Sequence, residues 1–180
     1  MKDSNKWDGS IREGGVRLCG TCSRILRSIA IDNFIIEDTI WFSVFGKPAT
    51  QGSKRVFGRG KFAPDNENLT MWRAAVAAAG GEAYGRGELI EDAIVMTTQF
   101  TFPRPKSHFG TGKNARKLKA SSPSLPIGKP DITKLVRAVE DALTGVVYKD
   151  DSQIVSSMPS KMYGDQYVTT IYIQRITVDK

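Results

Sequence analysis

The sequence contains few cysteines and histidines, the residues that form disulfides and structural zinc sites. It has two cysteines and one histidine among 180 residues. Cys19 and Cys22 have the spacing of half a zinc site, but a structural zinc site needs four ligands and His108 lies far away in the chain. We expect two reduced cysteines, the alternative being a site shared between the two chains of a dimer.

Long apolar runs are also missing. No stretch approaches the roughly 20 apolar residues that a membrane-spanning helix needs. The first residues mix both charge signs without an apolar core, which is unlike a secretory signal. These absences and the low cysteine content favour a cytoplasmic protein with no membrane partner. The composition, 40% hydrophobic and 25% charged, is that of a single globular domain with or without a tail.

Acidic residues are absent from Gln99 to Pro130, in a chain whose net charge is +7. The excess lies in residues 41–120, which hold 13 Lys and Arg against 6 Asp and Glu. A field of one sign attracts a polyanion, so we expect nucleic acid as the partner; a solvated loop whose charge aids solubility is the alternative. The cations expected to contact DNA are Lys54, Arg55, Arg104, Lys106, Lys113, Arg116, Lys117, Lys119, Lys129 and Lys134.

Apolar periodicity divides the chain into an irregular extension, residues 1–38, and one domain, residues 39–180. Alternating apolar residues predict strands at 41–45, 93–102 and 166–177, with shorter strand pieces at 146–148 and 153–156. Trp41 and Trp72 are expected in the core. Because strands and helices interleave, the fold class is α/β or α+β, with a small mixed sheet packed against two main helices.

Two helices are predicted from apolar residues three and four positions apart. The first begins after Pro64-Asp65 and ends or frays at Gly80-Gly81. The second runs from Asp131 to Thr144, with Gly145 as its stop. Residues 103–130 between the two helices form a long loop, which in a small domain is usually functional or disordered.

Acidic residues frame the second helix, with Asp131 at its start and Asp150 and Asp151 shortly after its end. The helix from Asp131 to Thr144 covers about 20 Å. An extended return from Gly145 to Asp151 also covers about 20 Å, which would place Asp151 beside Asp131. Carboxylates gathered there would hold a hard divalent cation such as Mg²⁺, because this ion takes oxygen ligands.

Such a site would suit phosphodiester hydrolysis. A bound divalent metal acidifies a water molecule and acts as a Lewis acid on the phosphoryl oxygens. Arg137 and Lys134, six and three residues beyond Asp131, could stabilise the developing charge. Each acid also has a simpler interpretation. Asp131 is most simply an N-cap, and Asp150-Asp151 is most simply a turn. Glu140 and Asp141 resemble ordinary surface acids.

Three blocks around these acids resemble a known family. Lys129 to Leu135, Ala138 to Gly145 and Tyr148 to Val155 resemble the signature of RusA-type Holliday junction resolvases. The family pattern reads roughly K/R-P-D-x-D-N/K-L-x-K/R-x-x-x-D-A-L-x-G, followed by a short strand and x-D-D-x-Q-V. Residues 46–55 and 102–108 also resemble phage-borne members, so that the resemblance covers residues 41–178.

The resemblance implies a homodimer that binds four-way DNA junctions and makes paired, symmetric nicks in recombination and repair. It implies Mg²⁺ as the cofactor, with Mn²⁺ as the expected substitute, no small-molecule cofactor, and a bacterial or phage-infected host. Asp131 and Asp151 match essential aspartates of the family, Asp150 lies beside them, and Arg137 stands where the family has a functional lysine. The expected catalytic residues are Asp131, Asp150, Asp151 and Arg137, and the expected metal ligands are the three aspartates with Thr133.

Thr133 departs from the pattern, because the family has its second aspartate at this position. A threonine hydroxyl carries no charge, so the metal affinity is expected to fall. Three hypotheses follow: a junction-cutting enzyme, a catalytically impaired RusA-like protein that binds branched DNA without cutting it, and a general nucleic-acid chaperone. Incubation with a synthetic four-way junction, with and without Mg²⁺, separates them.

Overall fold

The computed structural model describes residues 34–52, 56–57, 61–62, 67–85 and 87–178. Its helices are α2 (Glu67–Tyr84) and α3 (Ile132–Leu143), and its short 3-10 helices are η1 (Lys106–His108), η2 (Gly112–Asn114) and η3 (Asp151–Gln153). Its strands are β1 (Phe34–Phe45), β2 (Val56–Phe57), β3 (Lys61–Phe62), β4 (Ala93–Pro103), β5 (Ile154–Gly164) and β6 (Val168–Val178). Among the described residues, no helix is long and apolar enough to cross a membrane.

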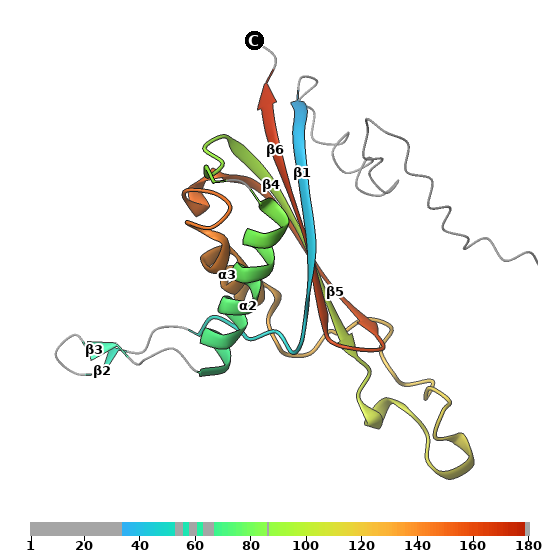
Figure 1. Cartoon of the computed structure of the whole chain (residues 1–180). Helices are drawn as coiled ribbons and strands as arrows, with labels where there is room; N and C mark the ends of the chain where they lie inside the picture. The colour runs from blue at the N-terminus through green and yellow to red at the C-terminus, as the bar shows by residue number, and fades with distance from the viewer. Residues whose placement is uncertain (1–33, 53–55, 58–60, 63–66, 86, 179–180) are drawn as a thin grey trace, which may run out of the picture. The chain divides into compact units, whose positions relative to one another are not determined.

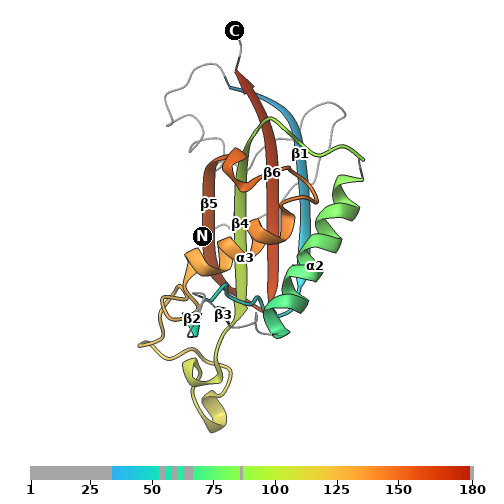
Figure 2. The same cartoon turned by 90° about the vertical axis from the view of Figure 1, so that its left-hand side faces the viewer.

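The main sheet has the strand order β1-β6-β4-β5, while β2 and β3 form a separate antiparallel pair. β4 is parallel to β5 and antiparallel to β6. Contacts from Ser43 to Thr170 and from Glu37 to Thr177 show that β1 and β6 also run in opposite directions. Helices α2 and α3 cover one face of this sheet, as Figures 1 and 2 show. The mixed sheet with two main helices confirms the expected α+β class.

The core lies between that face and the two helices. Along β4 the side chains of Ile94, Met96 and Phe100 point inward and are fully buried, as the alternation in the sequence predicts. The apolar stripe of α3 meets them, and its four expected positions are all buried: Leu135, Val139, Ala142 and Leu143. The buried leucine and valine side chains each contribute roughly 1.5–3 kcal/mol, which fixes α3 against the sheet.

The predicted end of the first helix at Gly80-Gly81 is wrong, because α2 continues to Tyr84. A Cβ atom on Gly80 would lie 2.5 Å from Cδ2 of Leu143, so this glycine lets α2 and α3 approach closely. The helix instead ends at Gly85, whose φ of +60° is the left-handed conformation typical of a helix stop.

Strand β5 was predicted only at its beginning. The short strand expected at 153–156 overlaps its first residues, but β5 continues to Gly164, and the strand expected at 146–148 is replaced by a turn. Pro159 lies in the middle of β5 opposite Thr98, and proline is rare within a sheet. It is tolerated because β5 is an edge strand, where one side needs no ladder hydrogen bonds.

The first strand also differs from expectation. β1 begins at Phe34, so that residues 34–38, assigned to an irregular extension, belong to the strand; residues 1–33 lie outside the described residues. Trp72 is buried as expected, but Trp41 is 61% exposed. It stacks on Tyr172 with ring centroids 6.4 Å apart, on the sheet face away from the helices.

Candidate active site

Helix α3 carries the predicted aspartates at its two ends. At the N-terminal end, Asp131 occupies the N-cap position, but its carboxylate makes no capping hydrogen bond. Its Oδ2 atom lies 3.4 Å from Nζ of Lys134, and both side chains are about half exposed. Exposed pairs of this kind contribute little to stability, so Asp131 is not needed by the fold as an ion-pair partner.

Strand β5 fixes the position of this N-terminal end. Nζ of Lys161 donates hydrogen bonds to the carbonyl oxygens of Gly128 at 2.8 Å and Pro130 at 3.0 Å. In the sheet register Lys161 lies opposite Phe100 of β4. The start of α3 is therefore level with the second half of β4 and β5.

The chain turns tightly after α3 and does not return along it. Gly145 has a φ of +75°, as expected for the helix stop, and the amides of Val146 and Val147 both donate to the carbonyl of Leu143 at 3.0 Å. The buried Tyr148 then donates its hydroxyl to the carbonyl oxygen of Glu140 at 3.1 Å. Burial raises the pKa of this hydroxyl, so Tyr148 stays a protonated donor that holds the turn against the helix.

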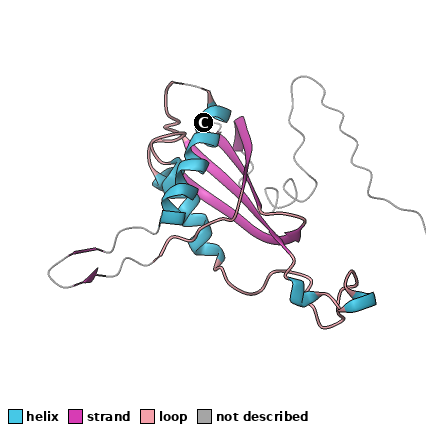
Figure 3. Ribbon diagram, turned by 60° about the horizontal axis from the view of Figure 1, so that its bottom comes forward, coloured by secondary structure: helices cyan, strands magenta, loops and turns pink. Residues whose placement is uncertain are grey.

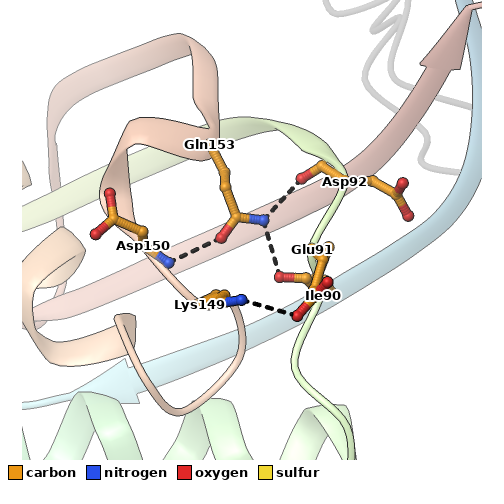
Figure 4. A network of polar contacts seen from close by, with 6 residues as sticks. All are labelled: Ile90, Glu91, Asp92, Lys149, Asp150 and Gln153. Atoms are coloured by element: carbon orange, nitrogen blue, oxygen red, sulfur yellow. Dashed lines mark hydrogen bonds and ion pairs between the residues drawn. The ribbon is translucent and has the colours of Figure 1, made fainter.

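The acidic loop that follows contains Asp150 and Asp151. Asp150 caps η3, because its Oδ1 atom accepts a hydrogen bond from the amide of Ser152 at 2.9 Å. Hydrogen bonds from the side chain of Ser152 and then from its backbone amide lower the pKa of the Asp150 carboxyl, with a smaller contribution from a hydrogen bond with Asp151. Gln153 completes a capping box, since its Oε1 atom accepts from the amide of Asp150 at 2.8 Å, as Figure 4 shows.

Asp151 lies near the C-terminal half of α3. Partial burial raises the pKa of Glu140, and the negative charges of Asp151 and Asp141 raise it further, while Arg137 acts in the opposite direction. We call the set of Glu140, Asp141, Asp150 and Asp151 the acidic end of α3. The sequence interpretation of Glu140 as an ordinary surface acid is wrong, because this side chain is half-buried among like charges.

The predicted meeting of Asp131 and Asp151 within one chain is not found. Asp131 is level with Lys161, whereas Asp151 lies three residues before Ile154 at the start of the same strand. Lys161 lies seven steps along the strand from Ile154, which corresponds to about 23 Å. The prediction assumed that the chain from Gly145 to Asp151 runs back along α3. It instead remains at the C-terminal end of α3.

The described residues of one chain accordingly do not fit the divalent metal that the resemblance implies. Within them, no three His, Cys, Asp or Glu side chains form a group that could hold a metal ion. Thr133 is exposed on the first turn of α3 beside Asp131 and adds no charge. A single chain therefore offers isolated parts of a carboxylate site and no complete one.

The basic segment, residues 104–130, has a structure of its own. It contains η1 and η2, visible in Figure 3 beyond the end of β4, and a bridge between Phe109 and Leu118. The guanidinium of Arg104 donates to the carbonyl oxygens of Pro123 and Ser124 at 3.0 and 3.3 Å. The same group lies 4.3 Å from the centre of the Tyr163 ring, which attaches the segment to β5.

The other predicted DNA-binding cations are distributed along and beside this segment. Lys119 donates to the carbonyl of Ser107 at 2.8 Å, so this side chain helps to hold the segment. Lys54 and Arg55 lie outside the described residues. The remaining cations are exposed at the surface: Lys106, Lys113, Arg116, Lys117, Lys129, Lys134 and also Arg137 of α3.

Sequence reasoning missed two residues that organise the site. Gln153 belongs to the signature block, so the sequence did contain a signal for it. Lys161 had none, because its role depends on the parallel pairing of β4 with the part of β5 that follows the predicted piece 153–156. Both act on the backbone around the predicted aspartates.

The fold and site define a mixed α+β domain in which a long basic segment and an acidic loop flank one central helix. Residues 46–174 match the family model described as Endodeoxyribonuclease RusA. The chain belongs to this family of endodeoxyribonucleases, and the resemblance of its signature blocks is confirmed. It is also 31% identical over 142 residues to the uncharacterized protein YqaN of Bacillus subtilis (strain 168), covering 78% of this chain and 99% of that protein.

Proposed function

We propose that this protein resolves Holliday junctions and related branched DNA by paired nicking, as a homodimer that depends on Mg²⁺ or on Mn²⁺ in its place. The observation that carries the proposal is the family match over residues 46–174, which include the basic segment, α3 and the acidic loop. A bacterial cytoplasm, or that of a phage-infected host, is the proposed setting.

The basic segment is proposed to bind the phosphates of the junction arms. Its exposed cations Lys106, Lys113, Arg116 and Lys117 lie in a stretch without a carboxylate, so no like-charged group in the segment repels the DNA. Lys129 and Lys134 continue this charge toward Asp131. Phosphate contacts of this kind orient the DNA without reading its sequence.

Asp131, Asp151 and Arg137 are proposed to act on the scissile phosphodiester. Asp150 is proposed to contribute through its capping of η3, which shapes the loop that carries Asp151. Arg137, midway along α3, is suited to stabilise negative charge that develops on the phosphoryl oxygens. A divalent metal, when bound, would supply the acidified water and Lewis acid that this chemistry needs.

The separation of Asp131 from Asp151 suggests how a homodimer completes the site. Lys134 and Arg137 lie in the N-terminal half of α3, whereas Glu140 and Asp141 lie in its C-terminal half. Two copies of α3 related by a two-fold axis and running in opposite directions would place opposite charges together. Asp131 of one protomer would then approach the partner's Asp151 at each end, giving two equivalent sites for two nicks.

The test is cutting of a synthetic four-way junction with end-labelled strands, with and without Mg²⁺. We expect nicks at symmetric positions in two opposing strands, in the presence of Mg²⁺ or Mn²⁺ only. Binding without cutting under all these conditions would overturn the proposal. It would support the alternative of an impaired binder, which Thr133 and the separated carboxylates favour.

Subunit mixing tests the shared site. A heterodimer of Asp131→Asn and Asp151→Asn chains, purified with two different tags, keeps one intact site if each site uses both protomers. We expect this heterodimer to nick one strand, whereas each homodimeric variant cuts neither. A heterodimer as inactive as its parents would show that both aspartates act within one chain.

A further inference from the structure

We infer that Gln153 is a positioning residue for cleavage, because its side-chain amide joins the acidic loop to the segment before β4 and so fixes Asp151. This inference rests on the proposed function, since it assigns Gln153 a part in that reaction. The network is drawn in Figure 4, where Gln153 lies between Asp150 on one side and Ile90 and Asp92 on the other.

The amide of Gln153 uses both of its polar atoms. Nε2 donates to the carbonyl oxygens of Ile90 at 2.8 Å and Asp92 at 2.9 Å. Oε1 accepts from the backbone amide of Asp150 at 2.8 Å. One acceptor and two N–H donors are therefore matched to three backbone groups, and only a primary amide offers this combination at this length.

The side-chain amide of Gln153 lies where the segments before β4 and β5 meet. The segments before β4 and β5 run side by side: the amide of Ile90 donates to Val147 and that of Lys149 donates to Ile90. The paired ladder of β4 with β5 begins at Ile94 and Ile154. Gln153 joins the two segments just before that point, through the carbonyl oxygens of Ile90 and Asp92.

The consequence for Asp151 follows from its neighbours in the chain. Asp150 is held through its backbone amide by Gln153 and through its carboxylate by the amide of Ser152. Asp151 lies between these two anchored residues, so the direction of its side chain depends on both anchors. Lys149 adds an exposed ion pair with Glu91 at 3.1 Å, which by itself would hold the loop weakly.

The test compares Gln153→Glu and Gln153→Met. Glutamate keeps an acceptor, lacks both donors and brings a negative charge to two carbonyl oxygens; methionine lacks all three interactions at similar size. We expect kcat for junction cutting to fall about 10–100-fold in both, the usual effect of removing a group that orients a reactive one. KM and the junction affinity should stay within about twofold, since the phosphate-binding cations are untouched.

A purely structural role is separated by a matched control. Ser43→Ala removes the hydrogen bond of 3.0 Å between the hydroxyls of Ser43 and Thr170, which joins β1 to β6 at the edge of the sheet away from β5. All proteins are assayed well below their melting temperatures. If Ser43→Ala lowers kcat as much as the Gln153 variants at an equal loss of stability, or if the Gln153 variants keep the wild-type kcat, the inference is wrong.

Hydrogen exchange supplies a measurement that does not depend on cutting. In wild type the amides of Asp150 and Ser152 should be protected, and Gln153→Met should lose protection at both while the amides of β6 keep theirs. Unchanged protection of these two amides in Gln153→Met would show that Gln153 does not hold the acidic loop. Wild-type protein that shows the protection but never cuts a junction would instead overturn the proposed function.

Discussion

The two ends of α3 differ in how their charges are used. At the N-terminal end a single acid, Asp131, lies among the cations Lys129, Lys134 and Lys161, and it carries no bond that the fold needs. At the C-terminal end four acids gather, and their loop is held by a capping box and by the side chain of Gln153. One end is suited to receive DNA, and the other presents a fixed group of carboxylates.

Under the proposed function, the two ends of α3 have different parts. The N-terminal, cationic end would attract DNA, because a polyanion is drawn to a field of opposite sign. The acidic end repels phosphate, so its carboxylates would act at a defined place only because their loop is held. The shared-site proposal connects the two, since the acidic end of one protomer meets the cationic end of its partner. The predictions below are ordered by the size of the expected effect.

The largest effect is expected from Asp151→Asn. The change keeps size and shape but removes the charge at the tip of the anchored loop, so cutting should fall by at least about 10²-fold. Junction binding should be kept or rise slightly, because an acid next to DNA is lost. Cleavage rates and gel-shift affinities are the measurements, with Asp165→Asn, an exposed acid of the β5–β6 turn, as control. Wild-type cutting by Asp151→Asn would show that the acidic end has no catalytic part.

The next largest effect is expected from the cations of the basic segment, and it is an effect on junction binding. Changing Lys113, Arg116 and Lys117 together to Ala should weaken junction binding by about tenfold or more. It should also make the log–log salt slope less negative by about 0.9 per lost duplex phosphate contact. Lys119 is left in place because it holds the segment through Ser107. The control is Lys149→Ala, a cation paired with Glu91 at the acidic end, which should leave the slope unchanged. Equal slopes for the triple variant and wild type would contradict the assignment of this segment.

The sequence predicted α3 because its signals are local. The apolar spacing, Asp131 before the first turn and Gly145 after the last one act within a few residues, and all three are found where expected. β4 was predicted for the same reason, from simple alternation. Of β5 only the beginning was predicted, as the piece 153–156, because its proline and serines give no pattern and its strand state depends on parallel pairing with β4, far earlier in the chain.

The site was predicted in part. The lengths of the helix and of the segment from Gly145 to Asp151 set a limit on the distance between Asp131 and Asp151. They did not determine in which direction the chain runs after α3. The direction is set by non-local contacts: Tyr148 bonds to Glu140, and Ile90 pairs with the segment around Tyr148. No sequence spacing contains that information. The chemical nature of the residues was visible in the sequence, but their grouping required the fold.

A smaller effect is expected from Thr133→Asp, which adds an acid at the cationic end. Thr133 is exposed on the first turn of α3, where a negative charge also interacts favourably with the helix dipole, so the fold should tolerate the change. Cutting at limiting Mg²⁺ should rise several-fold if a carboxylate is what this end lacks. Thr133→Asn, similar in size and uncharged, is the matched control and should give no gain. A loss of cutting with Asp would contradict the view that Thr133 weakens the site.

The smallest effect is expected from Glu140→Gln, and it is an effect on stability. Burial and the neighbouring charges of Asp151 and Asp141 raise the pKa of Glu140, so the folded protein disfavours its ionised form. Stability is lost as the pH rises from the ordinary pKa of about 4.3 through the raised value, and the loss is complete above it. At pH 7 the variant should therefore melt higher, by at most about 4 °C.

The same variant tests whether Asp151 lies where the fold places it. Below about pH 4 the difference in melting temperature should vanish, because Glu140 is then protonated in both the folded and unfolded wild type. In an Asp151→Asn background the gain at pH 7 should shrink, since one of the repelling charges is already gone. Glu82→Gln, an exposed change on α2, should show neither behaviour. A gain that is the same with and without Asp151 would mean that the two ends of α3 do not differ in the way described, because the acidic loop would not be held against the helix.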